Sequence, residues 1–128
     1  MNKYRDKSDF EINKAVAEII HHGKIFTQAY SFGDICGNSV QWIGGYAEYI
    51  HVDFCKDPAD AMPIIIENGI SLINSDGVHF AAAPGCGIEG YLGGDTVGYG
   101  SRKYSENENI YRAAMEVFLM MKDAENES

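Results

Sequence analysis

The residues with the most distinctive chemistry lie in and after a glycine-rich segment, residues 84–100. This segment holds seven of the 14 glycines, and glycine-rich backbone can present several N–H groups to an anion. Arg102 and Lys103 follow it, between Tyr99 and Tyr104. Arginine can bind phosphate through two parallel hydrogen bonds, and a tyrosine ring can stack on a base. The pattern predicts a site for a small anionic, nucleotide-type ligand; the alternative is a surface loop that ends in solvated cations.

Cys86 lies within this segment, between Gly85 and Gly87, and is the best candidate nucleophile in the chain. A nucleophilic thiol requires a base and an orienting group, and neither stands beside it in the sequence. We therefore place Cys86 and Gly87 among the predicted ligand-binding residues, with a small residue in a tight turn as the simpler alternative. A small hydrolase that uses Cys86 or Glu89 with a histidine brought close by folding is a further alternative.

Neither a cofactor nor a metal is predicted. Gly85, Gly87 and Gly90 match G-x-G-x-x-G, but this pattern indicates a dinucleotide site only where a strand precedes it and a helix follows. Residues 89–94 have no helical pattern. The four histidines and three cysteines occur at none of the short spacings that are typical of metal sites.

Two more candidate ligand-binding residues, Trp42 and Arg112, stand outside the segment. Arg112 could add a third cation to the anion site, or it could form a salt bridge with Glu108 or Glu116 at helical i±4 spacing. Trp42 lies in an aromatic stretch that could expose a stacking platform or an interface. Packing in the core is the alternative for Trp42.

The acidic balance of the chain argues against nucleic acid as a partner. Ten Lys and Arg stand against 19 Asp and Glu, which gives a net charge of −9. Between residues 25 and 101 the only Lys or Arg is Lys56, whereas binding to a phosphate backbone needs clustered cations. An acidic surface with exposed aromatic residues could instead meet a host protein. This makes an inhibitor or adaptor the second candidate function.

Size and cysteine content predict one cytoplasmic domain. A chain of 128 residues can bury one ordinary core, so we expect residues 1–128 to form a single domain. The three cysteines are widely spaced, and the first residues lack the apolar stretch of a secretory signal. No apolar run approaches the roughly 20 residues that cross a bilayer. We expect neither secretion nor a membrane partner.

Two longer helices are predicted from a shared capping signal. The capping-box spacing S-x-x-E begins at Ser8 and again at Ser105. Apolar residues then recur at helical spacing over residues 9–22 and 110–124. The tail, residues 125–128, is expected to fray.

A short helix is predicted after Asp57, where acids suit the start of a helix. Pro63 falls in its first turn only if Asp60 is the cap. Asn68-Gly69 is a common way for a helix to end.

The remaining apolar runs alternate and are separated by turn residues, which is typical of antiparallel strands. The predicted strands cover residues 24–31, 38–43, 47–54, 70–74 and 78–83. The fold class is therefore α+β, with two longer helices and one short helix packed against a mainly antiparallel sheet of about five strands.

Three blocks of the sequence carry a family resemblance: Ser8–Asn13, Pro58–Asn68 and Arg112–Met121. In order and wording they are similar to the NinX-like family of small phage and prophage proteins. The resemblance implies an accessory protein that acts in the cytoplasm of the bacterial host, and it implies no particular activity. This chain has Met62 where the family commonly has Trp, and its glycine-rich region is longer than is usual in the family.

The residues and the phage context together predict a non-enzymatic binding protein. We expect it to sequester a small anionic ligand, such as a nucleotide-type signal of host defence, near the glycine-rich segment and at the interface of a homo-oligomer. An inhibitor or adaptor of a host factor and a small hydrolase are the alternatives.

Overall fold

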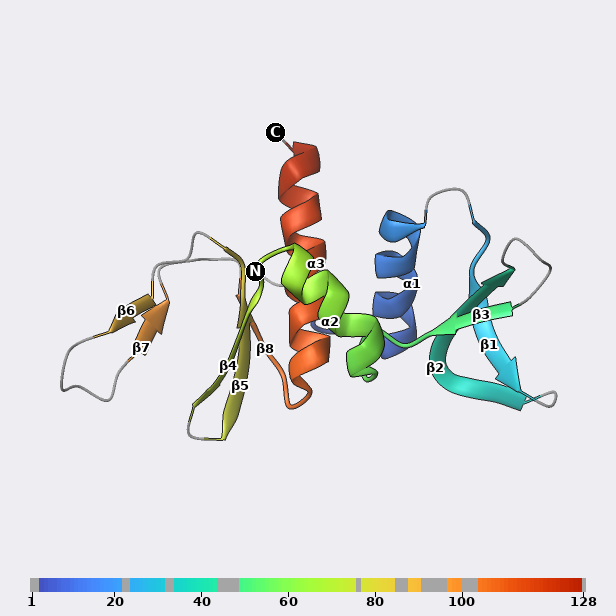
Figure 1. Cartoon of the computed structure of the whole chain (residues 1–128), viewed down its shortest axis with the longest axis horizontal. Coiled ribbons are helices and arrows are strands. Elements are labelled where there is room, and N and C mark those ends of the chain that lie inside the picture. Colours follow the sequence, from blue (N-terminus) through green and yellow to red (C-terminus); the bar gives the residue numbers. More distant parts are fainter. Residues whose placement is uncertain are drawn as a thin grey trace.

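The computed structural model describes most of the chain: residues 3–21, 24–31, 34–43, 49–75, 77–84, 88–90, 97–99 and 104–127. Three helices form the middle of an elongated molecule, and a three-stranded antiparallel sheet lies at either side of them (Figure 1). A small two-stranded ribbon extends beyond one of these sheets.

Helix α1 spans Asp9–Ile20 and begins at the capping box that the sequence predicts. The Ser8 hydroxyl accepts a hydrogen bond from the Glu11 N–H at 3.1 Å. The helix ends at Ile20, slightly before the predicted end at His22. Its buried residues are Ile12, Asn13, Val16 and Ala17.

Helix α2 spans Pro58–Glu67 and is capped by Asp57, not by Asp60. The Asp57 carboxylate accepts a hydrogen bond from the Ala59 N–H at 2.9 Å. Pro63 therefore lies inside the helix, which corrects its predicted place in the first turn. The residue is on the exposed side of α2, where the carbonyl that its missing N–H leaves unbonded can be hydrated.

The predicted end of α2 at Asn68-Gly69 is confirmed. Gly69 has a φ of 66°, in the left-handed region. The Gly69 N–H donates to the Ile66 carbonyl at 3.2 Å. The next N–H, that of Ile70, donates to the Ile65 carbonyl at 3.0 Å. These two bonds form a Schellman motif, which satisfies carbonyls that the last turn leaves free.

Helix α3 spans Ile110–Glu127. The predicted capping box at Ser105 is wrong, because Ser105 is buried in a strand. Asn109 is the cap: its side-chain oxygen accepts hydrogen bonds from the N–H groups of Tyr111 at 3.0 Å and Arg112 at 3.4 Å. The helix continues to Glu127, so most of the tail predicted to fray is helical.

The first sheet contains β1 (Thr27–Ser31), β2 (Asp34–Ile43) and β3 (Tyr49–Val52) in that order. All three predicted strands are present here, although β2 begins at Asp34, earlier than predicted. Helix α1 packs against β2. The glycine turn predicted at 44–45 lies outside the described residues.

The second sheet contains β4 (Ser71–Ser75), β5 (Val78–Ala82) and β8 (Tyr104–Glu106) in that order. The hairpin of β4 and β5 confirms the last two predicted strands. Strands β6 (Ile88–Gly90) and β7 (Val97–Tyr99) form the separate ribbon. Helix α3 packs against β5 and β8.

The α+β class is confirmed, with two longer helices and one short helix. The five predicted strands fall into two sheets rather than one, because α1 and α3 each pack against a different sheet. The short strands β6, β7 and β8 were not predicted, since three-residue strands in and beside a glycine-rich segment show no alternating pattern.

A continuous hydrophobic core joins the helices to both sheets. It includes Val16 of α1, Val40 of β2, Ile64 of α2, Ala81 of β5 and Phe118 of α3. The helices therefore form the central layer on which both sheets depend.

Replacing Gly69 tests the left-handed end of α2. We expect Gly69→Ala to lower the free energy of unfolding by about 1–2 kcal/mol, because a Cβ is unfavourable at positive φ. Gly69→Asn should cost less, since asparagine tolerates this conformation. The added Cβ would meet Pro84 at an ordinary 3.6 Å. Urea denaturation measures both variants, and equal losses for Ala and Asn would contradict the conformational explanation.

Candidate functional site

The glycine-rich segment leaves one strand of the second sheet and returns on the neighbouring strand. Ala82, the last residue of β5, is the register partner of Tyr104, the first residue of β8. Farther out, Ile88 of β6 is the register partner of Tyr99 of β7. The chain therefore runs out and back through two paired points, and the ribbon lies at the far end of the molecule from the first sheet (Figure 1).

Most of the predicted ligand-binding residues lie in the stretch of chain that leads from β5 through the ribbon to Tyr104 of β8. Four lie outside the described residues: Cys86, Gly87, Arg102 and Lys103. Tyr99 belongs to β7. The Tyr104 side chain is 47% exposed, and its ring centroid lies 6.4 Å from that of Phe80 on β5. Tyr104 therefore has a ring face available to solvent beside the segment.

The candidate acid–base residues are spread over both ends of the molecule. Glu89 of β6 is paired in register with Gly98. His79 lies in β5, and its Nδ1 forms a hydrogen bond with the Asn74 side-chain oxygen. His51 is exposed on β3, at the opposite end from β6 (Figure 1). Of these two histidines, only His79 lies on the sheet that carries the segment.

Trp42 is part of the hydrophobic core. Its side chain is only 5% exposed. The indole lies 4.6 Å from the His21 ring and 5.5 Å from the Phe26 ring, between ring centroids. It sits on β2, so the fold does not bring it together with the glycine-rich segment (Figure 1). The core alternative for Trp42 is therefore favoured over a stacking platform.

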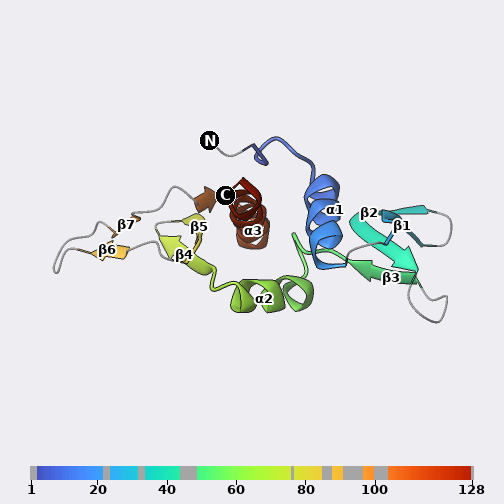
Figure 2. The same cartoon turned by 90° about the horizontal axis from the view of Figure 1, so that it is seen from above.

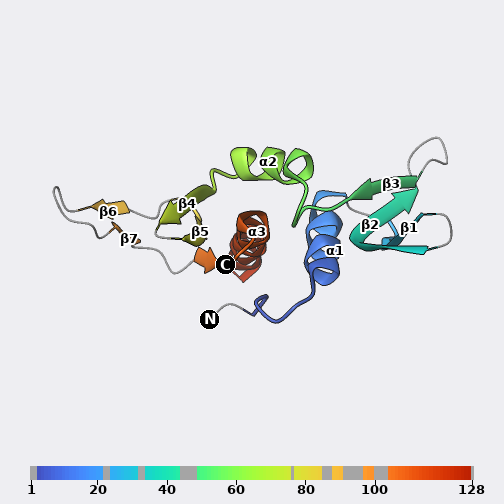
Figure 3. The same ribbon diagram turned by 90° about the horizontal axis from the view of Figure 1, so that it is seen from below.

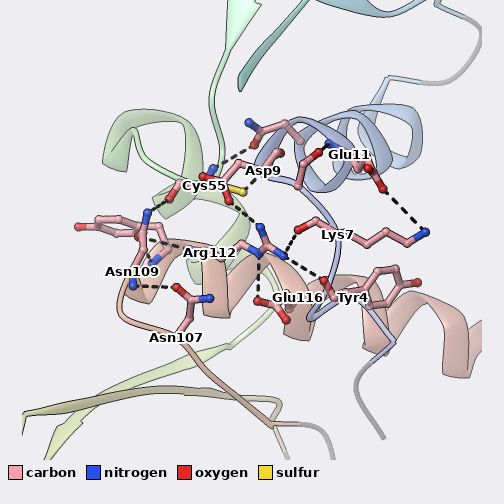
Figure 4. Close-up of polar contacts among 12 residues, drawn as sticks. Tyr4, Lys7, Asp9, Glu11, Cys55, Asn107, Asn109, Arg112 and Glu116 are labelled. Carbon is pink, nitrogen blue, oxygen red and sulfur yellow. Dashed lines mark hydrogen bonds and ion pairs between the residues drawn. The ribbon is translucent and has the colours of Figure 1, made fainter. Parts of the chain in front are cut away.

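The Arg112 guanidinium is buried and donates to acceptors within the protein (Figure 4). Nη1 donates to the Asp9 carboxylate at 2.6 Å, and Nε donates to the Glu116 carboxylate at 3.0 Å. Nη2 donates to the carbonyl of Tyr4 at 3.0 Å and to that of Lys7 at 2.6 Å. The guanidinium is thus occupied by two carboxylates and two carbonyls.

These contacts distinguish between the two interpretations of Arg112, a cation of the anion site or a partner in a salt bridge. The predicted salt bridge with Glu116 is present, whereas Glu108 is exposed and forms no salt bridge among the described residues. Burial disfavours the charged form of Arg112, but the hydrogen bond to Asp9 and the charge of Glu116 outweigh it, so the pKa of Arg112 lies above its ordinary value. Arg112 holds the fold together and does not face an external anion.

A second set of buried polar contacts, which was not predicted from the sequence, extends this network. The Asn13 side chain accepts a hydrogen bond from the Cys55 N–H at 3.0 Å and donates to Asp53 at 2.9 Å. The Asn109 side chain donates to the Cys55 carbonyl at 2.6 Å. Asn13 lies on the apolar stripe of α1, beside Val16. A polar residue in that stripe was the available signal.

The Cys55 thiol is fully buried and donates to the Asp9 carbonyl, with Sγ 3.8 Å from the oxygen. Burial raises the pKa of Cys55 far above its ordinary value, and the Asp9 carboxylate raises it further. Because the thiolate is the nucleophilic form, Cys55 is an inert core residue. In the described part of the chain, no buried side-chain nitrogen or oxygen lacks a hydrogen-bond partner.

The segment before α1 is held against α3 at a second point. The Tyr4 hydroxyl donates to the Asp123 carboxylate, and Lys3 Nζ lies 3.1 Å from it. Partial burial opposes ionisation of Asp123, but the hydrogen bonds from Tyr4 and Lys3 outweigh it, so the pKa of Asp123 is below its ordinary value.

Two clefts of similar size open between the elements. One of about 420 Å³ lies among the three helices, and its lining includes Phe54, Asp60, Ile64 and Phe118. Burial raises the pKa of Asp60, although the Asp53 N–H donates to its carboxylate. The other cleft, of about 410 Å³, is lined mainly by polar residues: Arg5, Asp6, His79, Glu106, Asn107 and Glu108.

Over the residues whose positions are described, no cluster of His, Cys, Asp or Glu is arranged to hold a metal ion. In the same part of the chain, none of the helices combines the length and apolar character needed to cross a bilayer.

Comparison with known proteins identifies the family. The family model described as Bacteriophage P22, NinX matches residues 3–122. The chain belongs to this family. No curated protein and no solved structure matches it.

The blocks that resemble NinX sequences lie on the three helices, and the first and third meet in the buried network of Arg112. Asp9 comes from the first block and Arg112 from the third. Met62, in the second block, is partly buried and packs against the core. The ribbon of β6 and β7 belongs to none of these blocks.

Removing the Arg112 charge tests the network of this NinX protein. We expect Arg112→Leu to cost about 3–5 kcal/mol, because it leaves the buried Glu116 carboxylate without its partner. Arg112→Leu combined with Glu116→Leu should recover part of this loss, since Asp9 is partly exposed and can be hydrated. Lys14→Leu, which removes an exposed pair with Glu18, is the control and should change stability by about 0.5 kcal/mol or less. Urea denaturation decides: losses that simply add would rule out coupling.

The burial of Cys55 predicts slow thiol labelling. In a Cys36→Ser, Cys86→Ser background, Cys55 is the single thiol. We expect it to react with a maleimide only as fast as the protein opens, and rapidly in urea, because the native thiol is buried and protonated. Mass spectrometry over time follows the reaction. Labelling in native buffer as fast as that in urea would contradict this placement.

Proposed function

We propose that this NinX-family protein is a phage accessory protein that binds a small anionic, nucleotide-type ligand on the ribbon that carries β6 and β7. The observation that supports this most is the double pairing of the ribbon, with Ala82 opposite Tyr104 at its base and Ile88 opposite Tyr99 farther out. Residues 83–87 join the two paired points on one side, and residues 100–103 join them on the other.

The two connections hold four of the proposed ligand-binding residues, all outside the described residues: Cys86 and Gly87 on one, Arg102 and Lys103 on the other. They are proposed for their chemistry and for their place in the sequence between strands that pair. Tyr104 stands at the base of the ribbon with its exposed ring.

The chemistry of these residues suits a phosphate with an attached base. Arg102 can bind a phosphate through two hydrogen bonds, and the glycine N–H groups can add more. A tyrosine can stack on the base. Because the chain carries a net charge of −9, an anion would gain little from long-range attraction and would depend on these local contacts. Arg112 and Trp42 are left out of the proposed site because both are committed to the core.

The test is to incubate the protein with cyclic dinucleotides, cyclic trinucleotides and ADP-ribose derivatives, remove unbound nucleotide, and analyse what heat releases. Intact nucleotide in the released fraction is the expected result. A converted nucleotide would instead support the hydrolase based on Cys86 or Glu89. Retention of none of these probes would overturn the proposal in favour of an inhibitor or adaptor of a host protein.

A double substitution then locates the site. Hydrogen bonds to charged groups contribute about 1.5–3 kcal/mol each, so Arg102→Ala with Lys103→Ala should weaken binding of the retained nucleotide by about 100-fold or more. Lys14→Ala with Lys24→Ala removes the same charge from half-exposed Lys14 on α1 and from exposed Lys24 after it, and is the matched control. Isothermal titration calorimetry measures both. Equal affinities for the two double variants would exclude this site.

A further inference from the structure

The cleft of about 420 Å³ among the three helices is a second candidate binding site. Each helix contributes to its lining: α1 through Ile20, α2 through Ile64 and α3 through Phe118. In Figures 2 and 3, α2 lies along one side of the pair formed by α1 and α3, and the ribbon of β6 and β7 lies far from this region. Small-molecule sites usually have volumes of about 300–1,000 Å³. The cleft therefore has room for a small organic molecule.

Part of the lining is apolar and fixed by the core. Phe54, Ile64 and Phe118 border the cleft, although their side chains are only 4%, 7% and 2% exposed. All three belong to the hydrophobic core, where close packing holds side chains in place. They offer a preformed surface to an aromatic or aliphatic group.

Two carboxylates belong to the same lining, and both come from α2. Asp60 and Glu67 stand seven residues apart, which is about two helical turns, so they lie on one side of the helix. Neither forms an ion pair with any residue that the structure describes. The apolar surface is thus accompanied by negative charge.

The negative charge of Asp60 has little compensation. Its carboxylate is partly buried and accepts a hydrogen bond from the Asp53 N–H at 2.9 Å. Burial raises the pKa of Asp60 more than this hydrogen bond lowers it, and the charges of Asp57 and Asp53 raise it further. A positive group beside Asp60 would stabilise the ionised carboxylate.

Lys122 is the only Lys or Arg among the described residues of the lining. Its Nζ lies 3.4 Å from the Glu125 carboxylate, so a negative charge already accompanies it. The same Nζ lies 5.5 Å from the centroid of the Phe118 ring. An ammonium group is attracted to an aromatic face at this distance, which shows that the Phe118 ring accepts a cation.

We propose that this cleft binds a small organic cation, with an aromatic body against Phe54, Ile64 and Phe118 and an ammonium group beside Asp60. A neutral molecule of the same shape leaves the Asp60 charge without a partner, and an anion meets two carboxylates. The net charge of −9 also attracts cations from solution. The site differs from the ribbon in its place and in the charge of its ligand, so it can fail or succeed independently of the proposed function.

Three indole compounds that differ in one terminal group test the charge of the ligand. At neutral pH tryptamine carries an ammonium, tryptophol a hydroxyl and indole-3-propionate a carboxylate. Isothermal titration calorimetry should show that tryptamine binds about tenfold more tightly than tryptophol, and that indole-3-propionate binds most weakly. In NMR spectra, tryptamine should shift the signals of Phe54, Ile64 and Phe118. Failure of tryptamine to bind, equal affinities for tryptamine and tryptophol, or shifts confined to other residues would overturn the proposal.

Replacing Asp60 tests the carboxylate. Asp60→Asn keeps a side-chain oxygen that can accept the Asp53 N–H, so the circular dichroism spectrum should be unchanged. The variant should bind tryptamine about tenfold more weakly and tryptophol as before. Glu18→Gln is the matched control, because it removes the same charge from an exposed position of α1 outside the lining. Equal tryptamine affinities for the two variants would show that Asp60 does not hold the ammonium.

A second substitution changes the charge of the lining without altering the core. Ile20 lines the cleft and is 39% exposed, so Ile20→Lys adds a cation at an accessible position. Tryptamine should then bind about threefold to tenfold more weakly, and indole-3-propionate should bind more tightly. Ile25→Lys is the control, because Ile25 is 86% exposed and lies outside the lining. If Ile20→Lys changes the two affinities no more than Ile25→Lys does, the compounds bind elsewhere and the proposal fails.

Discussion

The fold depends on burying one guanidinium. The Arg112 side chain is only 7% exposed, and a charge removed from water is tolerated only where partners replace its hydration. Those partners come from well-separated parts of the chain: Asp9 at the start of α1, Glu116 one turn along α3, and the carbonyls of Tyr4 and Lys7. The segment before α1 must therefore lie against α3, and the angle at which α1 leaves that segment is set as well.

The parts of the fold set by neighbouring residues were predictable from the sequence. The Ser8 cap and the glycine stop of α2 each depend on a few adjacent residues, and both were predicted correctly. The cap of α3 was not, because Ser105 has the same spacing as Ser8 but is paired in a strand, and Asn109 takes its place. The division of the strands into two sheets was also missed, since it depends on which helix each sheet covers.

The site residues show the same limit. For Arg112 and Trp42 the sequence allowed either a ligand-binding residue or a residue of the core. Both side chains are buried, which favours the core. Burial depends on the whole fold and cannot be predicted from one residue and its neighbours. Asn13, Cys55 and Asn109 were missed because their contacts join segments separated by 42 or 54 residues. By contrast, the strand pairing adds information that the sequence of the glycine-rich segment does not carry. Ala82 pairs with Tyr104 and Ile88 pairs with Tyr99, so residues 83–87 and residues 100–103 each connect the same two pairs of strands.

The buried network of Arg112 and the ribbon of β6 and β7 lie in different parts of the fold. The blocks that resemble the NinX family lie on the helices and include the Asp9–Arg112 pair, which helps to pack the helical layer. The ribbon leaves from Ala82 and returns at Tyr104, and Ala82 is 1% exposed, so its base is fixed by the core. A segment whose two ends are clamped on adjacent strands can differ in length and composition without moving the helices. Because the family model matches residues 3–122, membership covers the ribbon as well as the helices, and the core fixes only where the ribbon begins and ends.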